Sequence, residues 1–202
     1  MALSAQDKIL YVANKLGLST LGQMQGSTGA VYDVDTDISG QIFSSASRHQ
    51  NPGITNITEN QFEVNEALLV ETIGFYVKNS SNEVRNFQQQ YGSDAVIVYD
   101  LVIGNKRVMK DTPIFAAGSP FTFANVAQAT QAVGESVNAS FLPRHQTFME
   151  GAGILIPPQV QWYVDYRMFN VVTGASIPIT DAATIGCYLF GTRVLLNFNT
   201  TI

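Results

Sequence analysis

The strongest constraint on the fold of this chain is a period of two in hydrophobicity that recurs from Phe62 onward. The longest example is Gln159–Val172, where bulky apolar residues recur at every second position. Successive side chains of a strand point to opposite faces, so this run predicts one long β-strand. One face carries Val160, Trp162, Val164, Tyr166 and Met168, and the other carries Gln161, Tyr163, Asp165, Arg167 and Phe169.

A second alternating run covers residues 69–77. One predicted face carries Leu69, Glu71, Ile73, Phe75 and Val77, and the other carries Val70, Thr72, Gly74 and Tyr76. Further along the chain, Gly104–Asn105 is typical of a two-residue hairpin turn after the β-branched run Ala95–Ile103. Gly191 separates two late apolar segments, and we expect it to form a bend or a bulge.

All such segments together give about eight to ten strands with turn residues between them. This pattern predicts a mainly β protein with a jelly-roll or β-sandwich body over residues 62–202. Residues 1–61 are expected to form an extended N-terminal arm, with one strand near Val31–Ile38. Residues 125–137 fit a short helix and an irregular insertion equally well, so both alternatives stay open.

The arm begins with the one clear helical pattern of the sequence. Ser4 is placed to cap a helix, Asp7 follows three residues later as in a capping box, and Gly17 is placed to end it. The apolar stripe consists of Ala5, Ile9, Val12, Ala13 and Leu16. Because so short a helix is marginal alone in water, we expect the stripe to pack on the body or on a neighbouring subunit.

Composition excludes several classes of protein. Only 13 % of the residues are charged, the net charge is −5, and Asn, Gln, Ser and Thr account for 58 of the 202 residues. Disordered chains combine low hydrophobicity with high net charge, and nucleic-acid binders normally carry a basic patch, so neither class fits. The single cysteine excludes an intramolecular disulfide framework, and no apolar run reaches the length of a membrane span.

Three alternating aspartates, Asp33, Asp35 and Asp37, have the spacing with which a calcium-binding EF-hand loop begins. Such a loop requires glycine at its sixth position and glutamate at its twelfth, where this chain has Ile38 and Ser44. We therefore expect a solvated strand edge, with all three carboxylates on one face. Cation binding by the three carboxylates is the alternative.

Catalytic side chains are few. His49 and His145 are the only histidines, and we expect both in partly exposed loops. Gly134–Asn138 matches the Gly-x-Ser-x-Gly motif of serine hydrolases only at its first and third positions. Cys187 lies in an apolar strand, which raises the pKa of a thiol and favours an inert core cysteine. The sequence therefore predicts no enzyme activity, no catalytic residue, no metal and no cofactor.

Two other clusters have a structural interpretation. Lys106, Arg107 and Lys110 follow the predicted hairpin turn, so we expect them at a hairpin tip or along a sheet edge. Charges at an edge commonly prevent unwanted strand pairing, whereas three charges on an acidic chain are weak evidence for phosphate binding. Gly151–Gly153 lacks the third glycine and the βαβ setting of a dinucleotide site.

Aromatic residues of the longest strand have two interpretations. Trp162 and Tyr166 share a face with Val164, which favours packing in the core, while Tyr163 points the other way. A platform on which a sugar ring stacks is the alternative, because aromatic side chains supply such surfaces.

The C-terminal half also resembles a known group of proteins. In order along the chain come Gly153–Pro158, the long strand Gln159–Val172, and the closing strands Ile185–Phe190 and Val194–Phe198. With the arm and the first strand of the body, Asn60–Glu66, this arrangement resembles single jelly-roll structural proteins of bacteriophage and other virus particles. The resemblance is one of pattern and composition over residues 60–202.

This resemblance implies a non-enzymatic virion structural protein, a capsid or capsid-associated subunit that self-assembles through its β body and N-terminal arm. Its partners would be copies of itself and other virion proteins, with assembly into the virion in the host cytoplasm. Large neutral-polar contacts repeated around a symmetry axis suit such a subunit, because amides and hydroxyls avoid the desolvation cost of buried charge.

The charge of the arm separates this chain from shell proteins whose basic arm binds the genome. Residues 1–61 hold three basic and five acidic residues, a net charge of −2. We therefore expect the arm to contact protein or to lie against a membrane-lined interior, without direct sequence-specific binding of nucleic acid. The alternative function is a carbohydrate- or receptor-binding β-sandwich module of a phage particle.

Overall fold

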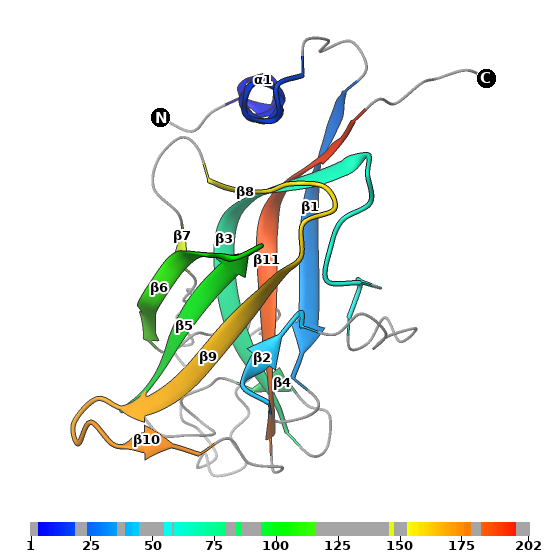
Figure 1. Ribbon diagram of the computed structural model, residues 1–202. Coiled ribbons are helices and arrows are strands. Elements are labelled where there is room, and N and C mark those ends of the chain that lie inside the picture. Colours follow the sequence, from blue (N-terminus) through cyan, green and yellow to red (C-terminus); the bar gives the residue numbers. More distant parts are fainter. Residues whose placement is uncertain are drawn as a thin grey trace, which may run out of the picture.

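The computed structural model describes residues 4–18, 24–35, 39–44, 55–57, 59–79, 84–85, 94–115, 146–147, 153–178 and 183–196. This part of the chain is mainly β, with one helix and two sheets of antiparallel strands. The two sheets are stacked face to face as a sandwich, and the helix lies at one end of it (Figure 1). The predicted mainly β, sandwich-like class is confirmed.

The first sheet, which we call sheet A, has the strand order β1–β11–β3–β4, and two further short strands also pair with β3. Its strands are β1 (Gln25–Val34), β3 (Glu66–Asn79), β4 (Val84–Arg85), β7 (Gln146–Thr147), β8 (Ile154–Ile156) and β11 (Ala183–Leu195). Strand β1 pairs with β11 over its whole length without a shift in register. A segment that the sequence analysis assigned to the arm therefore forms one edge of sheet A.

The second sheet, sheet B, has the strand order β10–β9–β5–β6, and β2 also pairs with β9. Its strands are β2 (Gln41–Ile42), β5 (Ala95–Ile103), β6 (Lys106–Phe115), β9 (Trp162–Asn170) and β10 (Ser176–Ile177). The turn between β5 and β6 consists of Gly104 and Asn105, as predicted, and the φ of Gly104 is 58°. A positive φ at the first turn residue suits glycine and matches the twist of the two strands.

The helix α1 (Ala5–Leu16) begins and ends where the sequence predicts. The Ser4 hydroxyl accepts a hydrogen bond from the Asp7 N–H at 3.2 Å, and the Asp7 carboxylate accepts one from the Ser4 N–H at 3.2 Å. This capping box satisfies backbone donors that a helix otherwise leaves unpaired. Gly17 ends the helix in the left-handed region, with φ of 70°.

The helix packs on sheet A of its own chain at one end of the sandwich (Figure 1), which answers the alternative left open by the sequence. It lies on the outer face, because the side chains beneath it form a cluster separate from the core between the sheets. Val12 on its inner side is fully buried against Leu69 of β3 and Val194 of β11. The Lys8 ammonium also lies 2.8 Å from the Glu71 carboxylate of β3. Sheet A is therefore covered by the helix at this end and by sheet B on its other face.

A β-bulge in β3 makes this arrangement possible. The register of β3 against β11 shifts where Phe190 pairs with Thr72 and Gly191 pairs with Val70, which leaves Glu71 without a partner in the ladder. Glu71 is the extra residue of the bulge. The predicted irregularity at Gly191 is confirmed, and the extra residue lies on the opposite strand.

The bulge also corrects the predicted faces of residues 69–77. Ile73 lies in the core between the sheets, whereas Leu69 lies in the cluster beneath α1, so the prediction that they share a face is wrong. An extra residue reverses the alternation of side chains, so Leu68 faces the core and Ala67 faces the helix. One strand thus supplies apolar residues to both of its faces.

The core between the sheets is rich in aromatic side chains. Trp162 is fully buried, with its ring centroid 4.6 Å from that of Phe43 and 5.7 Å from that of Phe62. The buried face of β9 is the predicted one, because Tyr166 is buried on the same side of the strand as Trp162. Phe75 of the opposite sheet reaches across to Tyr166, at a centroid distance of 6.3 Å. These contacts join the two sheets.

Candidate functional site

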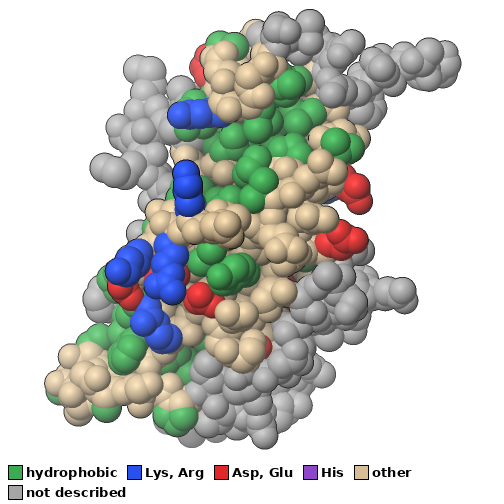
Figure 2. Space-filling view, viewed as in Figure 1, with side chains coloured by type: hydrophobic (Ala, Val, Ile, Leu, Met, Phe, Trp, Pro, Cys, Tyr) green, Lys and Arg blue, Asp and Glu red, His purple; other side chains and the backbone are tan. Residues whose placement is uncertain are grey.

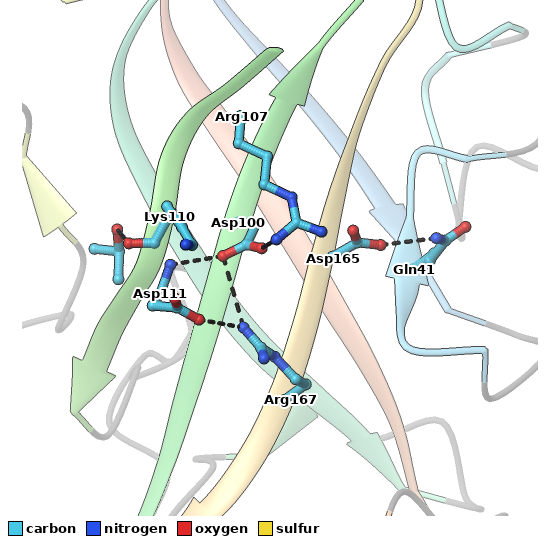
Figure 3. A network of polar contacts seen from close by, with 8 residues as sticks. Gln41, Asp100, Arg107, Lys110, Asp111, Asp165 and Arg167 are labelled. Carbon is cyan, nitrogen blue, oxygen red and sulfur yellow. Dashed lines mark hydrogen bonds and ion pairs between the residues drawn. The ribbon is translucent and has the colours of Figure 1, made fainter. Parts of the chain in front are cut away.

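A row of polar side chains crosses the outer face of sheet B. Gln41 of β2 pairs in register with Asp165 of β9, and Asp165 pairs in register with Asp100 of β5. The Gln41 side-chain amide donates to the Asp165 carboxylate at 2.7 Å. Two carboxylates directly opposite each other repel, so the row requires positive charge beside it. We call Gln41, Asp100, Arg107, Asp111, Asp165 and Arg167 the polar row (Figure 3).

Asp100 is the centre of the polar row. Its carboxylate is only 3 % exposed and lies 3.2 Å from the Arg107 guanidinium and 3.7 Å from that of Arg167. The same carboxylate accepts a hydrogen bond of 2.6 Å from the Asp111 N–H. A buried carboxylate is costly unless it is paired and hydrogen-bonded, and both conditions are met here.

A second β-bulge places the Asp111 N–H beside the Asp100 carboxylate. The register of β5 against β6 shifts on both sides of Leu101, and Asp111 has a φ of 47°, which is unusual for a residue other than glycine. The shift turns the Asp111 N–H toward Asp100, while the Asp111 carboxylate accepts from Arg167 at 2.6 Å. Asp111 therefore contacts both Asp100 and its arginine partner.

The arginines of the polar row remain open to solvent. The side chains of Arg107 and Arg167 are 56 % and 50 % exposed, and Figure 2 shows Lys and Arg side chains gathered on this face beside acidic ones. A shallow pocket of about 290 Å³ lies over the row, and Asp165 and Gln41 also line it. The guanidinium groups retain donors for a hydroxylated or acidic partner surface.

Removal of the negative charge of Asp100 is expected to destabilise the fold. Asp100→Asn is expected to lower the free energy of unfolding by about 2 kcal/mol, because two guanidinium groups lose their buried counter-charge. The matched control is Asp165→Asn in the same row, where one amide hydrogen bond to Gln41 is affected and the loss should stay near 1 kcal/mol or less. Urea unfolding of both variants measures the difference, and equal losses would contradict the role assigned to Asp100.

The predicted solvated edge at the three aspartates is wrong for Asp33 and Asp35, which are both buried. The Asp33 carboxylate accepts a hydrogen bond of 2.9 Å from the Phe43 N–H. The Asp35 carboxylate accepts from the Gly40 N–H at 2.8 Å and from the Tyr166 hydroxyl at 2.9 Å. Backbone donors on either side of β2 and the Tyr166 hydroxyl of β9 replace water, so the two carboxylates hold the segment around β2 against the sandwich. Asp37 lies outside the described residues.

The structure describes only one of the remaining candidates for a nucleophile or a base. Cys187 is fully buried on β11, which confirms the predicted core cysteine. Burial raises the pKa of its thiol well above the usual value, and the nearby Asp33 carboxylate adds to the shift. His49, His145 and Gly134–Asn138 lie outside the described residues, as do residues 125–137 and Gly151.

The aromatic and basic clusters lie where the sequence predicts. Trp162 and Tyr166 are core residues, and Tyr163 lies half-buried on the opposite side of β9. Arg107 belongs to the hairpin of β5 and β6, and β6 is an outermost strand of sheet B, as predicted for a tip or an edge. The ion pair between Arg107 and Asp100 was not predicted from the sequence.

The polar row as a whole was missed from the sequence, although a signal for it exists. Asp100, Asp165 and Arg167 are charged residues within strands that are otherwise largely apolar. A charge at such a position is expected to have a partner when it is buried. The partner cannot be identified from spacing, because Gln41 and Asp165 are 124 positions apart.

Within the described ranges, no group of three or more His, Cys, Asp and Glu side chains is placed to hold a metal ion. No helix in the same part of the chain is long and apolar enough to cross a membrane. Comparison of the sequence and structure with protein-family models, curated proteins and solved structures found no match. The geometry of this chain therefore carries the functional argument.

Proposed function

We propose that this chain is a single jelly-roll structural subunit of a virus particle, a capsid or capsid-associated protein that associates with copies of itself. The observation that carries the proposal is the strand pairing. A jelly roll is a long antiparallel hairpin rolled up into two sheets, so its first strand pairs with its last, its second with its second-to-last, and so on inward. Jelly rolls are common in viral capsids.

The observed pairs follow this rule. For this comparison the short strands β7 and β8 are taken together as one, and the two-residue strands β4 and β10, which pair with β3 and β9, are set aside. In chain order, β1 then pairs with β11, β2 with β9, β3 with β7 and β8, and β5 with β6. Rolling such a hairpin adds the contacts β11 with β3 and β9 with β5, which are also present. This agreement of six strand contacts supports the jelly-roll topology.

The surface supports association between copies. Val64, Val108, Val171 and Val172 are apolar side chains at exposed positions, and Val172 is 74 % exposed. Charged residues are only 13 % of the chain, so large parts of a contact can form without burying unpaired charge. Symmetric oligomers repeat one such contact around an axis.

The proposal includes no catalytic step and no cofactor. Asp100, the most buried carboxylate of the polar row, is held by two guanidinium groups and a peptide N–H. A carboxylate whose oxygens are already paired in this way suits a structural contact. The partners proposed are copies of this chain and other virion proteins, assembled in the host cytoplasm.

The test is assembly of the purified full-length chain. Native mass spectrometry and negative-stain electron microscopy over a range of protein concentrations should show discrete symmetric oligomers that become larger as concentration rises. Added nucleic acid should leave the distribution of masses unchanged, because assembly is driven by protein contacts. A chain that stays monomeric at every concentration would contradict the proposed function.

The pocket over the polar row favours one second candidate, a carbohydrate- or receptor-binding module. Gln41, Arg107 and Arg167 line it with hydrogen-bond donors, which is how proteins orient polar ligands. Binding on a glycan array that is lost in Gln41→Ala, while the oligomeric state is unchanged, would favour this function. Tyr163→Ala tests whether the half-buried ring on the same sheet face contributes by stacking.

A further inference from the structure

Among the residues that the structure describes, part of the outer edge of β1 has no hydrogen-bond partner. Strand β1 is the outermost strand of sheet A (Figure 1). The Tyr32 N–H donates to the Asn56 side chain at 2.8 Å, so the backbone groups of Tyr32 point away from β11. Orientation alternates along a strand, and the ladder with β11 has no register shift, so Ala30, Thr28 and Gly26 also point outward.

Asn56 covers the lower part of this edge. Its side-chain amide donates to the Ala30 carbonyl oxygen at 2.7 Å, and its backbone N–H donates to the Tyr32 carbonyl oxygen at 3.2 Å. Thr55 adds a hydroxyl bond of 3.0 Å to the same carbonyl. Beyond Ala30, no described residue pairs with the outward N–H and C=O groups of Thr28 and Gly26.

One edge of sheet B, on the opposite side of the sandwich from β1, is by contrast protected in the usual ways (Figure 1). Strand β6 is the outermost strand there, and it carries Lys106, Arg107 and Lys110. It is also broken by the bulge at Asp111 and contains Pro113, which cannot donate a hydrogen bond. Charge, bulges and proline all prevent edge-to-edge pairing. Residues 25–30 of β1 have none of these features: the sequence there is Gln-Gly-Ser-Thr-Gly-Ala.

We propose that residues 25–30 of β1 pair antiparallel with the same residues of a second copy of this chain, which joins the two A sheets into one continuous sheet. The proposal rests on the proposed self-associating function and names the surface that it uses. A two-fold axis at Ser27 places Gly26 of each copy opposite Thr28 of the other. The outward N–H and C=O groups of both residues then complete four hydrogen bonds.

The chemistry of the edge favours a second copy as the occupant. The segment is uncharged, so two identical edges approach without repulsion. Gly26, Gly29 and Ala30 have little or no side chain, which allows the backbones to come close. Ser27 and Thr28 are exposed, so the edge is accessible from solvent. Pairing of a free edge with another strand is a general mode of protein association.

The test compares Thr28→Pro with Thr28→Ala in the full chain. Proline removes the outward N–H, which is not bonded to β11, and both variants remove the hydroxyl. Sedimentation equilibrium should show the dissociation constant of the dimer raised at least about tenfold by Thr28→Pro and little changed by Thr28→Ala. Thr28→Lys, which brings two like charges together at the axis, is a second disruptive variant. Circular dichroism checks that each variant is folded.

Hydrogen exchange of the Gly26 amide gives an independent measurement. In the wild-type chain this amide should become protected as concentration rises, and Thr28→Pro should abolish the dependence on concentration. Assembly of folded Thr28→Pro as tightly as wild type would overturn the edge proposal and leave the proposed function standing. A monomeric wild-type chain whose Gly26 amide is protected would also overturn it, because the edge would then be covered by its own chain.

Discussion

Gly191→Ala is expected to lower the free energy of unfolding by about 3 kcal/mol or more. Gly191 lies opposite the bulge in β3, where an added Cβ would overlap the carbonyl oxygen of Leu69 and lie 3.0 Å from the Glu71 nitrogen. Both are backbone atoms in the middle of sheet A, so neither can move without breaking the ladder. Urea or thermal unfolding of the variant gives the measurement.

The matched control for this variant is Gly174→Ala, in the turn between β9 and β10. Gly174 has a φ of 69° and nothing within 4 Å of an added Cβ, so only the conformational cost of about 1–2 kcal/mol applies. Lys8 of α1 pairs with Glu71 of the bulge, so Gly191→Ala should also increase hydrogen exchange in the helix. Equal destabilisation by the two alanines would show that close approach at Gly191 is not the cause.

Trp162→Ala is expected to cost about 3–5 kcal/mol. The side chain is fully buried, and its removal leaves a cavity between the rings of Phe43 and Phe62, which belong to different segments of the chain. The loss of buried apolar surface and of packing contacts together give this magnitude. Denaturant unfolding that is followed by circular dichroism avoids dependence on the tryptophan fluorescence that the variant lacks.

The neighbouring residue supplies the control for this core variant. Tyr163 lies on the other side of β9 and is only half-buried, so Tyr163→Ala should cost about 1 kcal/mol or less. Because the two positions are adjacent, differences in strand propensity largely cancel. Similar losses for both variants would contradict the assignment of alternate faces of β9 to core and surface.

Local signals in the sequence predicted a large part of the fold. Both ends of the helix could be predicted from the sequence, because the capping residues Ser4, Asp7 and Gly17 contact backbone groups only a few positions away. The two faces of β9 and the turn at Gly104 were also predictable, since alternation and turn chemistry extend over only a few residues. Each of these features is governed by neighbours along the chain.

Long-range contacts account for features that were predicted wrongly, or not at all, from the sequence. Asp33 and Asp35 were expected to be exposed, but both are buried. Their carboxylates accept hydrogen bonds from other segments, the loop around Phe43 and Tyr166 of β9. The faces of β3 were misassigned because one extra residue, Glu71, reverses the alternation. A bulge leaves no mark in hydrophobic periodicity when both faces of the strand are apolar.

The sequence by itself determined that this chain forms a helix at residues 5–16 and a set of alternating strands with an aromatic core face, because such patterns depend on local geometry. Only the tertiary structure decided that α1 packs on its own sheet A, that the polar row assembles across sheet B, and that part of the edge of β1 has no partner among the described residues. These features depend on which strands become neighbours, and strand pairing joins residues more than a hundred positions apart.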